Sequence, residues 1–159
     1  MLLSKRHFLL GFAALGGCGF EPVYGTRGTA NALRGTVQMD APKTRDEFRL
    51  NEQLELRLGR SSAPRYGLAV DLSTRQEGLA ISGSNDIERF NIIGRAKFTL
   101  RDLSTGQAVL SDTVNTFTAY SASEQPVATL AAQRDAQTRL MTSLADKIVT
   151  QMLLNADQL

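Results

Sequence analysis

Hydrophobic and polar residues alternate along several stretches of the chain, and two other stretches repeat apolar residues every three or four positions. Alternation is typical of half-buried strands, and the longer spacing is typical of helices that pack on one side. Strands are predicted at 35–39, 66–73, 89–101 and 108–120, and helices at about 45–58 and 123–154. Residues 74–88 are mostly polar and are predicted to form a loop, with the alternative that 79–81 extend a hairpin.

The first helix has clear end signals. Thr44 and Glu47 have the spacing of a capping box, in which each side chain accepts a hydrogen bond from the other residue's backbone N–H. Gly59 follows as a suitable C-terminal stop. The residues expected to face the core are Leu50, Leu54 and Leu58.

The second helix is predicted to start at Ser123, as N-cap, with Glu124 and Pro126 in its first turn. Its core stripe is predicted to consist of Val127, Leu130, Arg134, Gln137, Met141, Leu144, Ile148 and Met152, with Leu140 and Ala145 beside it. The whole pattern predicts the α+β class: a two-layer sandwich of two helices packed on one face of a small, mainly antiparallel four-stranded sheet.

The strand at 89–101 has one apolar face and one basic face. Arg89, Arg95, Lys97 and Arg101 share the basic face, with Ile93 between them. Cations combined with apolar atoms suit an anionic amphiphile, so these four residues are candidates for binding a phosphorylated lipid. The alternative is an ordinary solvated face, because basic side chains also protect a sheet from aggregation.

The N-terminus has the three parts of a secretory signal. Lys5 and Arg6 precede an apolar run at 8–15, and Gly16 and Gly17 precede Cys18. The run is too short for a membrane span, which needs roughly 20 apolar residues. The sequence 15–18, Leu-Gly-Gly-Cys, resembles the lipobox of bacterial lipoproteins, which implies cleavage before Cys18 and its acylation with chains such as palmitate.

The predicted organisation is a signal peptide at 1–17, a lipidated tether at 18–34 and one α+β domain at 35–159. Because no Asp follows at position +2, the expected destination is the outer membrane. Residues from 18 onward carry 16 basic and 16 acidic side chains, since 1–17 hold two of the 18 basic residues and no acid. A formally neutral domain gives no reason to expect nucleic acid as a partner.

The inventory of reactive side chains argues against an enzyme. His7 is the only histidine and lies in the signal, and Cys18 is the only cysteine and is expected to be acylated. Histidine-assisted nucleophilic catalysis and Cys or His metal sites are therefore not expected, and no cofactor is predicted.

The run at 15–25, Leu-Gly-Gly-Cys-Gly-Phe-Glu-Pro-Val-Tyr-Gly, resembles the start of the lipopolysaccharide-assembly lipoprotein family LptE. Later features are similar to this family and follow one another in the same order. They are the leucine-spaced first helix, the strand at Tyr66, the segments 94–96 and 98–102, and the long C-terminal helix containing 131–136. The resemblance covers most of residues 15–154, with Val23 where the family usually has Leu.

This resemblance implies a non-catalytic lipoprotein that plugs the lumen of the LptD β-barrel in the outer membrane. It implies help in assembling the barrel and in delivering lipopolysaccharide to the outer leaflet. The alternative function is an accessory lipoprotein of a phospholipid-trafficking ABC transport system.

Overall fold

Four strands form one sheet in the order β1-β2-β3-β4. The computed structural model describes residues 33–81 and 87–156. The strands are β1 (Val37–Met39), β2 (Tyr66–Ile81), β3 (Ile87–Asp102) and β4 (Ala108–Ser121), and the helices are α3 (Arg45–Leu58) and α4 (Pro126–Leu154). β1 runs parallel to β2, and the other neighbours are antiparallel.

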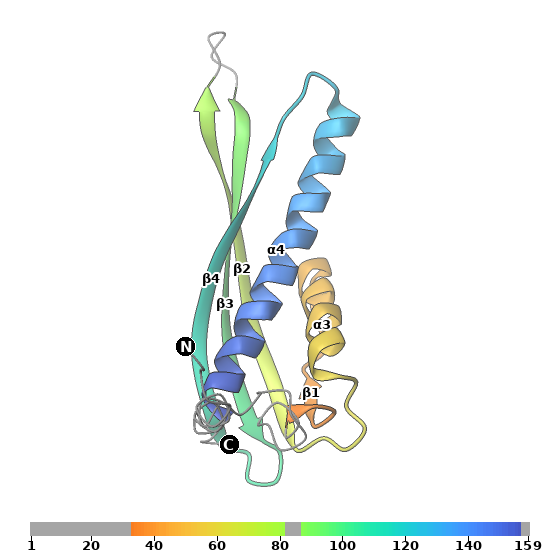
Figure 1. Cartoon of the computed structure of the whole chain (residues 1–159), viewed down its shortest axis with the longest axis vertical. Coiled ribbons are helices and arrows are strands. Elements are labelled where there is room, and N and C mark those ends of the chain that lie inside the picture. The colour runs from red at the N-terminus through yellow and green to blue at the C-terminus, as the bar shows by residue number, and fades with distance from the viewer. Residues whose placement is uncertain (1–32, 82–86, 157–159) are drawn as a thin grey trace, which may run out of the picture.

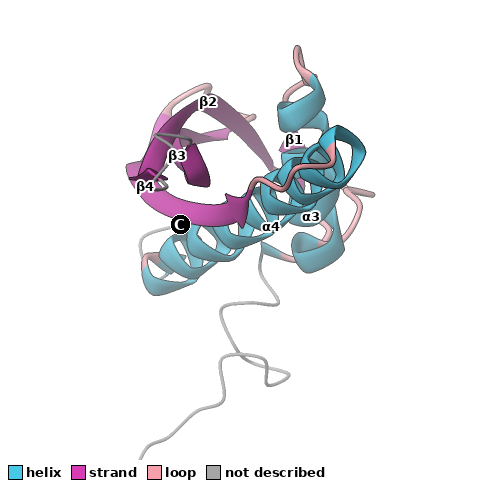
Figure 2. Ribbon diagram, turned by 90° about the horizontal axis from the view of Figure 1, so that it is seen from above, coloured by secondary structure: helices cyan, strands magenta, loops and turns pink. Residues whose placement is uncertain are grey.

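Both helices lie on the same side of the sheet (Figure 1). Viewed from above, the sheet is strongly curved and the helices stay on one side of it (Figure 2). The predicted α+β sandwich, with two helices on a mainly antiparallel four-stranded sheet, is confirmed.

The prediction of a loop over 74–88 was wrong for most of that range. β2 continues to Ile81, β3 begins at Ile87, and their ladder runs without a register shift from Tyr66 to Gly78. Only 82–86 lie outside the described residues. Side chains at 73–79 are exposed on both faces of the strand, so no apolar alternation marks it. Backbone pairing with β3 forms this part of β2, and the suggested extension through 79–81 is confirmed.

α3 begins and ends as predicted. The Thr44 Oγ1 accepts a hydrogen bond from the Glu47 N–H at 3.2 Å, and the Glu47 carboxylate accepts one from the Thr44 N–H at 3.2 Å. Gly59 follows the helix with a φ of 78°, a left-handed value that suits glycine. The three leucines at 50, 54 and 58 are buried, as their spacing predicts.

α4 begins differently from the prediction. Gln125 is the N-cap residue, without a side-chain cap, and Pro126 occupies the first turn as expected. Ser123 was wrong as the N-cap, because its hydroxyl donates to the Gln125 carbonyl and its N–H donates to Thr129 Oγ1 at 2.9 Å. Glu124 therefore precedes the helix and was wrongly placed in its first turn.

The core stripe of α4 was right in its C-terminal half and wrong near its start. Val127 is 82% exposed and Leu130 is 45% exposed, and Arg134 is also exposed. The buried stripe instead follows steps of four residues, which correspond to one of the natural ridges of a helix. Its members are Ala136, Leu140, Leu144, Ile148 and Met152, with Ala132 partly buried at its start.

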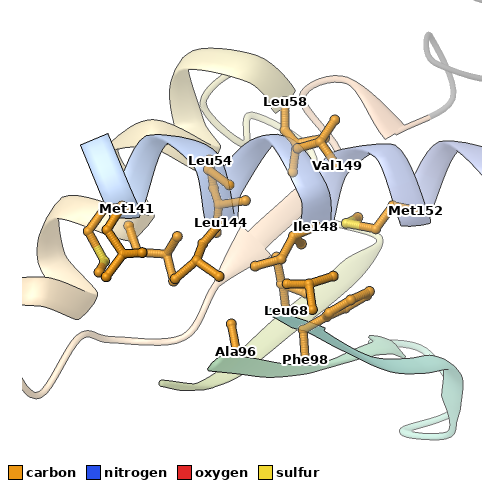
Figure 3. Packing of buried hydrophobic residues seen from close by; sticks show 14 of the residues in the cluster. Leu54, Leu58, Leu68, Ala96, Phe98, Met141, Leu144, Ile148, Val149 and Met152 are labelled. Carbon is orange, nitrogen blue, oxygen red and sulfur yellow. The ribbon is translucent and has the colours of Figure 1, made fainter. Parts of the chain in front are cut away.

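The core lies between the sheet and the lower part of the helix pair. Leu144 and Ile148 of α4 face Leu68, Ala96 and Phe98 of the sheet, and α3 adds Leu54 and Leu58 (Figure 3).

With 14 residues against 29, α3 is about half as long as α4 and lies beside its middle part (Figure 1). The first turn of α3 shares a hollow with residues 130–137 of α4, and Arg57 in its last turn pairs with Asp146. The first turn of α4 extends beyond α3, which leaves Val127 exposed, whereas Leu130 borders the hollow at the start of α3 and is less exposed.

Candidate functional site

The four basic residues of β3 lie on the face of the sheet that points away from the helices. Phe98 points into the core, and alternate residues of a strand point to opposite faces. Arg89, Arg95 and Lys97 are exposed, and Arg101 is partly buried. The structure therefore gathers all four on one face, which we call the outer face.

The basic row is too long to act as one site. Arg89 and Arg101 are 12 positions apart, which corresponds to about 40 Å along an extended strand. Only Arg95 and Lys97 are next neighbours on the outer face, at about 7 Å. A single phosphate can therefore contact that central pair but cannot contact the whole row.

Arg101 is already paired. Its Nη2 lies 3.0 Å from Oδ1 and 3.2 Å from Oδ2 of Asp40, the residue that follows β1. This pair ties the end of β1 to β3 and compensates the charge of Arg101. Arg101 is therefore a weaker candidate for binding an anion than Arg95.

Within 33–81 and 87–156, no carboxylate forms an ion pair with the other three cations, Arg89, Arg95 and Lys97. Asp71 is the direct cross-strand neighbour of Lys97, whereas Arg95 lies between the uncharged Ser73 and Asn115. The local charge is consequently most positive at Arg95.

Arg95 borders a shallow depression of about 370 Å³ on the outer face. Ser73, Thr74, Arg75, Ile93 and Asn115 complete its lining. The strand register puts Arg75 opposite Ile93, and Ile93 opposite Phe117, which is 63% exposed. We call Arg75, Ile93, Arg95 and Phe117 the basic–apolar patch.

Two members of this patch were not predicted from the sequence. Arg75 fell in the range assigned to a loop, and Phe117 was not distinguished from the other residues of its strand. Their partnership depends on a register that joins three strands, which the order of residues alone does not give. The available signal was an aromatic residue among threonines on an otherwise polar strand face.

The basic–apolar patch has the groups that an anionic amphiphile requires. The Arg95 guanidinium can form paired hydrogen bonds to phosphate or carboxylate oxygens. The Arg75 guanidinium lies 3.0 Å from the Glu77 carboxylate, which compensates part of its charge. The exposed surfaces of Ile93 and Phe117 can pack against hydrocarbon, whose transfer from water is favourable. The patch is open and shallow, so it suits a transient contact better than an enclosed ligand.

The described residues also bear on two other features, metal-ligand clusters and membrane-spanning helices. Within 33–81 and 87–156, no cluster of three or more potential metal ligands occurs. Neither α3 nor α4, nor any other helix in that part of the chain, combines the length and apolar character needed to cross a membrane. Cys18, the predicted acylation site, lies outside the described residues.

Three solved structures share this fold. A candidate lipoprotein of Caulobacter crescentus is 24% identical, with a TM-score of 0.68 and coverage of 79% of this chain and 93% of that chain. Rare lipoprotein B of Shewanella oneidensis is 12% identical, with a TM-score of 0.58 and coverage of 76% and 93%. A minor lipoprotein of Acinetobacter baumannii is 22% identical, with a TM-score of 0.54 and coverage of 76% and 90%.

No curated protein matches the sequence. The model of a protein family, described as LptE, lipopolysaccharide-assembly, matches residues 34–152. That range spans β1 through nearly all of α4, which is every regular element of the domain. The chain therefore belongs to the LptE lipopolysaccharide-assembly family.

Proposed function

We propose that this protein is an outer-membrane lipoprotein that plugs the LptD β-barrel, helps it assemble and assists delivery of lipopolysaccharide to the outer leaflet. The family match over residues 34–152 carries this proposal. Lipoproteins among the proteins of similar fold support the anchored part of it. The role is one of binding and assembly, without catalysis.

The anchor is Cys18, exposed by removal of residues 1–17. One acyl chain holds a protein only marginally, at about 0.8 kcal/mol per buried CH₂, so three chains give an essentially permanent anchor. The tether at 18–34 leads to the domain at 35–159. Leu33, near the end of that tether, is only 1% exposed. About 15 residues between Cys18 and Leu33 span at most about 50 Å when extended.

The outer face of the sheet is the proposed contact for lipopolysaccharide. Arg95 and Lys97 provide the central cations, and Arg89 lies near the far end of the hairpin. The basic–apolar patch adds Arg75 and two apolar side chains, so phosphates and hydrocarbon can be contacted side by side. Arg101 takes a lesser part because Asp40 compensates its charge.

Co-purification tests the partner. We expect the tagged, full-length lipoprotein extracted from outer membranes to carry a large β-barrel protein with it. Depletion of the protein should trap lipopolysaccharide inside the cell. A Cys18→Ser variant serves as the anchoring control, because it retains the domain and loses the acylation site.

Two outcomes would reject the proposal. Recovery of the lipoprotein without any barrel would remove the plug function. Recovery with an inner-membrane or periplasm-spanning transport complex would favour the alternative, an accessory lipoprotein of a phospholipid-trafficking ABC system.

A further inference from the structure

A hollow lies between α3 and α4 at the upper end of α3 in Figure 1, where that helix begins. Its volume of about 350 Å³ is near the lower end of the range of about 300–1,000 Å³ that is typical of small-ligand sites. The side chains that line it come from 44–49 of α3 and its cap, and from 130–137 of α4. The hollow belongs to the helix layer and is therefore separate from the outer face of the sheet.

The lower part of the interface between α3 and α4 is complementary in charge and hydrogen bonding. Arg57 of α3 forms an ion pair with Asp146 of α4, and the Thr142 hydroxyl of α4 donates to Gln53 Oε1 of α3 at 3.4 Å. At the hollow, by contrast, the described residues place cations of both helices around the same space. Like charges gathered in this way disfavour one another, so an anion between them would be stabilised.

Two of the three arginines at the hollow are uncompensated. Arg49 Nη1 lies 3.5 Å from Asp46 Oδ1, so that carboxylate compensates the Arg49 charge in part. Arg45 and Arg134 are exposed, and neither takes part in an ion pair among the described residues. Three guanidinium groups less one carboxylate leave a formal charge of +2 on the described lining residues.

Contacts on both helices hold these arginines in place. The capping box at Thr44 fixes the first turn of α3, which carries Arg45. On α4, Gln133 Nε2 donates to Gln76 Oε1 of β2 at 3.2 Å, and Thr118 Oγ1 of β4 donates to the Ala136 carbonyl at 2.9 Å. These contacts flank Arg134 in the sequence. The backbone around the hollow is therefore organised before a ligand binds, which lowers the cost of binding.

Apolar side chains continue from the hollow along α4. Leu130 lines the hollow and is 45% exposed, and Val127, which lies one turn earlier, is 82% exposed. Residues three and four positions apart are neighbours on a helix surface, so Val127, Leu130 and Arg134 form one row. An amphiphile whose anionic group contacts Arg134 could lay its hydrocarbon along Leu130 and Val127, and burial of apolar surface favours that contact.

We propose that this hollow binds the headgroup of a lipid that carries a phosphate monoester, with the phosphate between Arg45 and Arg134. A phosphate monoester has a charge of about −1.5 to −2 at pH 7, which matches two uncompensated arginines, whereas a phosphodiester or a carboxylate has a single charge. Each guanidinium can form paired hydrogen bonds to phosphate oxygens. The proposed function would supply a phosphorylated lipid, and only this natural source of the ligand rests on it.

Arginine modification tests the site in the full-length lipoprotein, purified in an uncharged detergent. Phenylglyoxal reacts with exposed guanidinium groups, and mass spectrometry of peptides gives the rate at each arginine. A short-chain phosphatidic acid, whose headgroup is a phosphate monoester, should slow the modification of Arg45 and Arg134 several-fold. Arg60 is the control and should react at an unchanged rate, because its side chain is 89% exposed and follows the opposite end of α3.

Three further probes separate the classes of ligand. A short-chain phosphatidylglycerol is a diester and should protect Arg45 and Arg134 several-fold less than the phosphatidic acid at equal concentration. Inorganic phosphate should protect them only at higher concentration, because it has no hydrocarbon to contact Leu130 and Val127. A short-chain phosphatidylcholine has no net charge and should give no protection.

Variants then assign the two parts of the ligand, with protection read at Arg45. Arg134→Gln should weaken binding of the phosphatidic acid about tenfold, a loss of about 1.4 kcal/mol. Lys147→Gln is the matched control, because it removes the same charge from an exposed residue about 20 Å further along α4 and should leave binding unchanged. Leu130→Ser should weaken binding of the phosphatidic acid and should leave binding of inorganic phosphate unchanged.

Several results would overturn the lipid-phosphate site. They are an absence of protection at Arg45 and Arg134, equal protection of Arg60, equal affinity for the monoester and the diester, or equal losses in Arg134→Gln and Lys147→Gln. Equal affinity for phosphatidic acid and inorganic phosphate would reject a lipid as the ligand. The partner test is independent of these results. A barrel recovered without protection of the two arginines would reject this inference alone, and protection without a barrel would reject the plug function alone.

Discussion

Gly94 of β3 and Leu144 of α4 define the closest approach between the sheet and the long helix. A Cβ atom added to Gly94 would lie 3.0 Å from Leu144 Cδ1, and 3.1 and 3.2 Å from the two methyl carbons of Leu140. All three residues are buried. The absence of a side chain at position 94 therefore lets α4 pack directly on the backbone of β3.

Replacing Gly94 by Ala should destabilise the domain. The added methyl overpacks a core whose neighbours are closely packed leucines, and this costs about 1–3 kcal/mol. Loss of the glycine's flexibility in the unfolded chain recovers about 0.5–1 kcal/mol. We expect a net decrease in the free energy of unfolding of about 1–2 kcal/mol, measured by urea denaturation.

Gly67→Ala is the matched control for that substitution. Its added Cβ would meet the tip of Leu103 at 3.1 Å, but Leu103 is 46% exposed and can move aside. The free energy of unfolding of Gly67→Ala should stay close to that of the wild type. Equal losses at the two positions would mean that close packing against α4 is not the cause.

The two helix starts give a second prediction. Thr44→Ala removes one half of a complete capping box and should lower the free energy of unfolding by about 1 kcal/mol. Ser123→Ala should cost less, because Ser123 lies before α4 and does not cap it. Thermal or chemical unfolding of both variants measures the difference, and a larger loss at Ser123 would contradict the assignment of Gln125 as N-cap.

The comparison of these two helices shows which parts of the fold the sequence could predict. Thr44 and Glu47 each accept a hydrogen bond from the other's backbone N–H, and Glu47 also accepts one from the neighbouring Lys43 N–H. All of these partners are local, so the spacing is sufficient to predict the cap. Ser123 has the right residue type for a cap, but its hydroxyl and N–H contact Gln125 and Thr129. Residue type was sufficient to predict the N-cap of α3, where the capping hydrogen bonds are local. It failed for α4, where Ser123 can either cap the helix or bond to Gln125 and Thr129.

The outer face shows the same limit at longer range. Alternation along β3 was enough to place Arg95 and Lys97 on one face. Arg75 and Phe117 join them through the registers β2–β3 and β3–β4, which depend on pairing between distant segments. The far half of β2 is exposed on both sides and carries no apolar pattern, so the patch could only be recognised once the strands were paired.

The turn after β3 provides a prediction on pH dependence. The hydrogen bond from the Ser104 hydroxyl, followed by those from the backbone N–H groups of Ser104 and Thr105, lowers the pKa of Asp102 below its ordinary value of 3.8. A lowered pKa means that this carboxylate stabilises the fold above that ordinary value, and that the contribution is lost as pH falls through the folded-state pKa.

Ser104→Ala should raise the pKa of Asp102 toward 3.8, because it removes the largest cause of the shift. Thr105→Val is the control, since it keeps the backbone N–H that contacts Asp102. Carboxyl-carbon NMR titration measures both variants. The assignment fails when Asp102 titrates at its ordinary value in the wild-type protein or when Thr105→Val has the larger effect.

The proposed lipopolysaccharide contact makes the most direct functional prediction. Arg95→Glu combined with Lys97→Glu should weaken binding of lipopolysaccharide by about tenfold or more, which corresponds to about 1.4 kcal/mol. Both side chains are exposed and unpaired among the described residues, so thermal unfolding should not change. Arg75→Glu should act in the same direction, because its guanidinium belongs to the same patch.

Two controls separate a local contact from general charge. Arg60→Glu makes the same charge change as Arg75→Glu, at a side chain that is 89% exposed and distant from the outer face, and it should leave binding unchanged. Arg101→Gln should have a smaller effect than loss of Arg95, because Asp40 already compensates that guanidinium. Dephosphorylated lipopolysaccharide should lose the dependence on Arg95, since paired hydrogen bonds to phosphate are what the guanidinium supplies. Unchanged binding by the Arg95 and Lys97 double variant would mean that the outer face is an ordinary solvated surface.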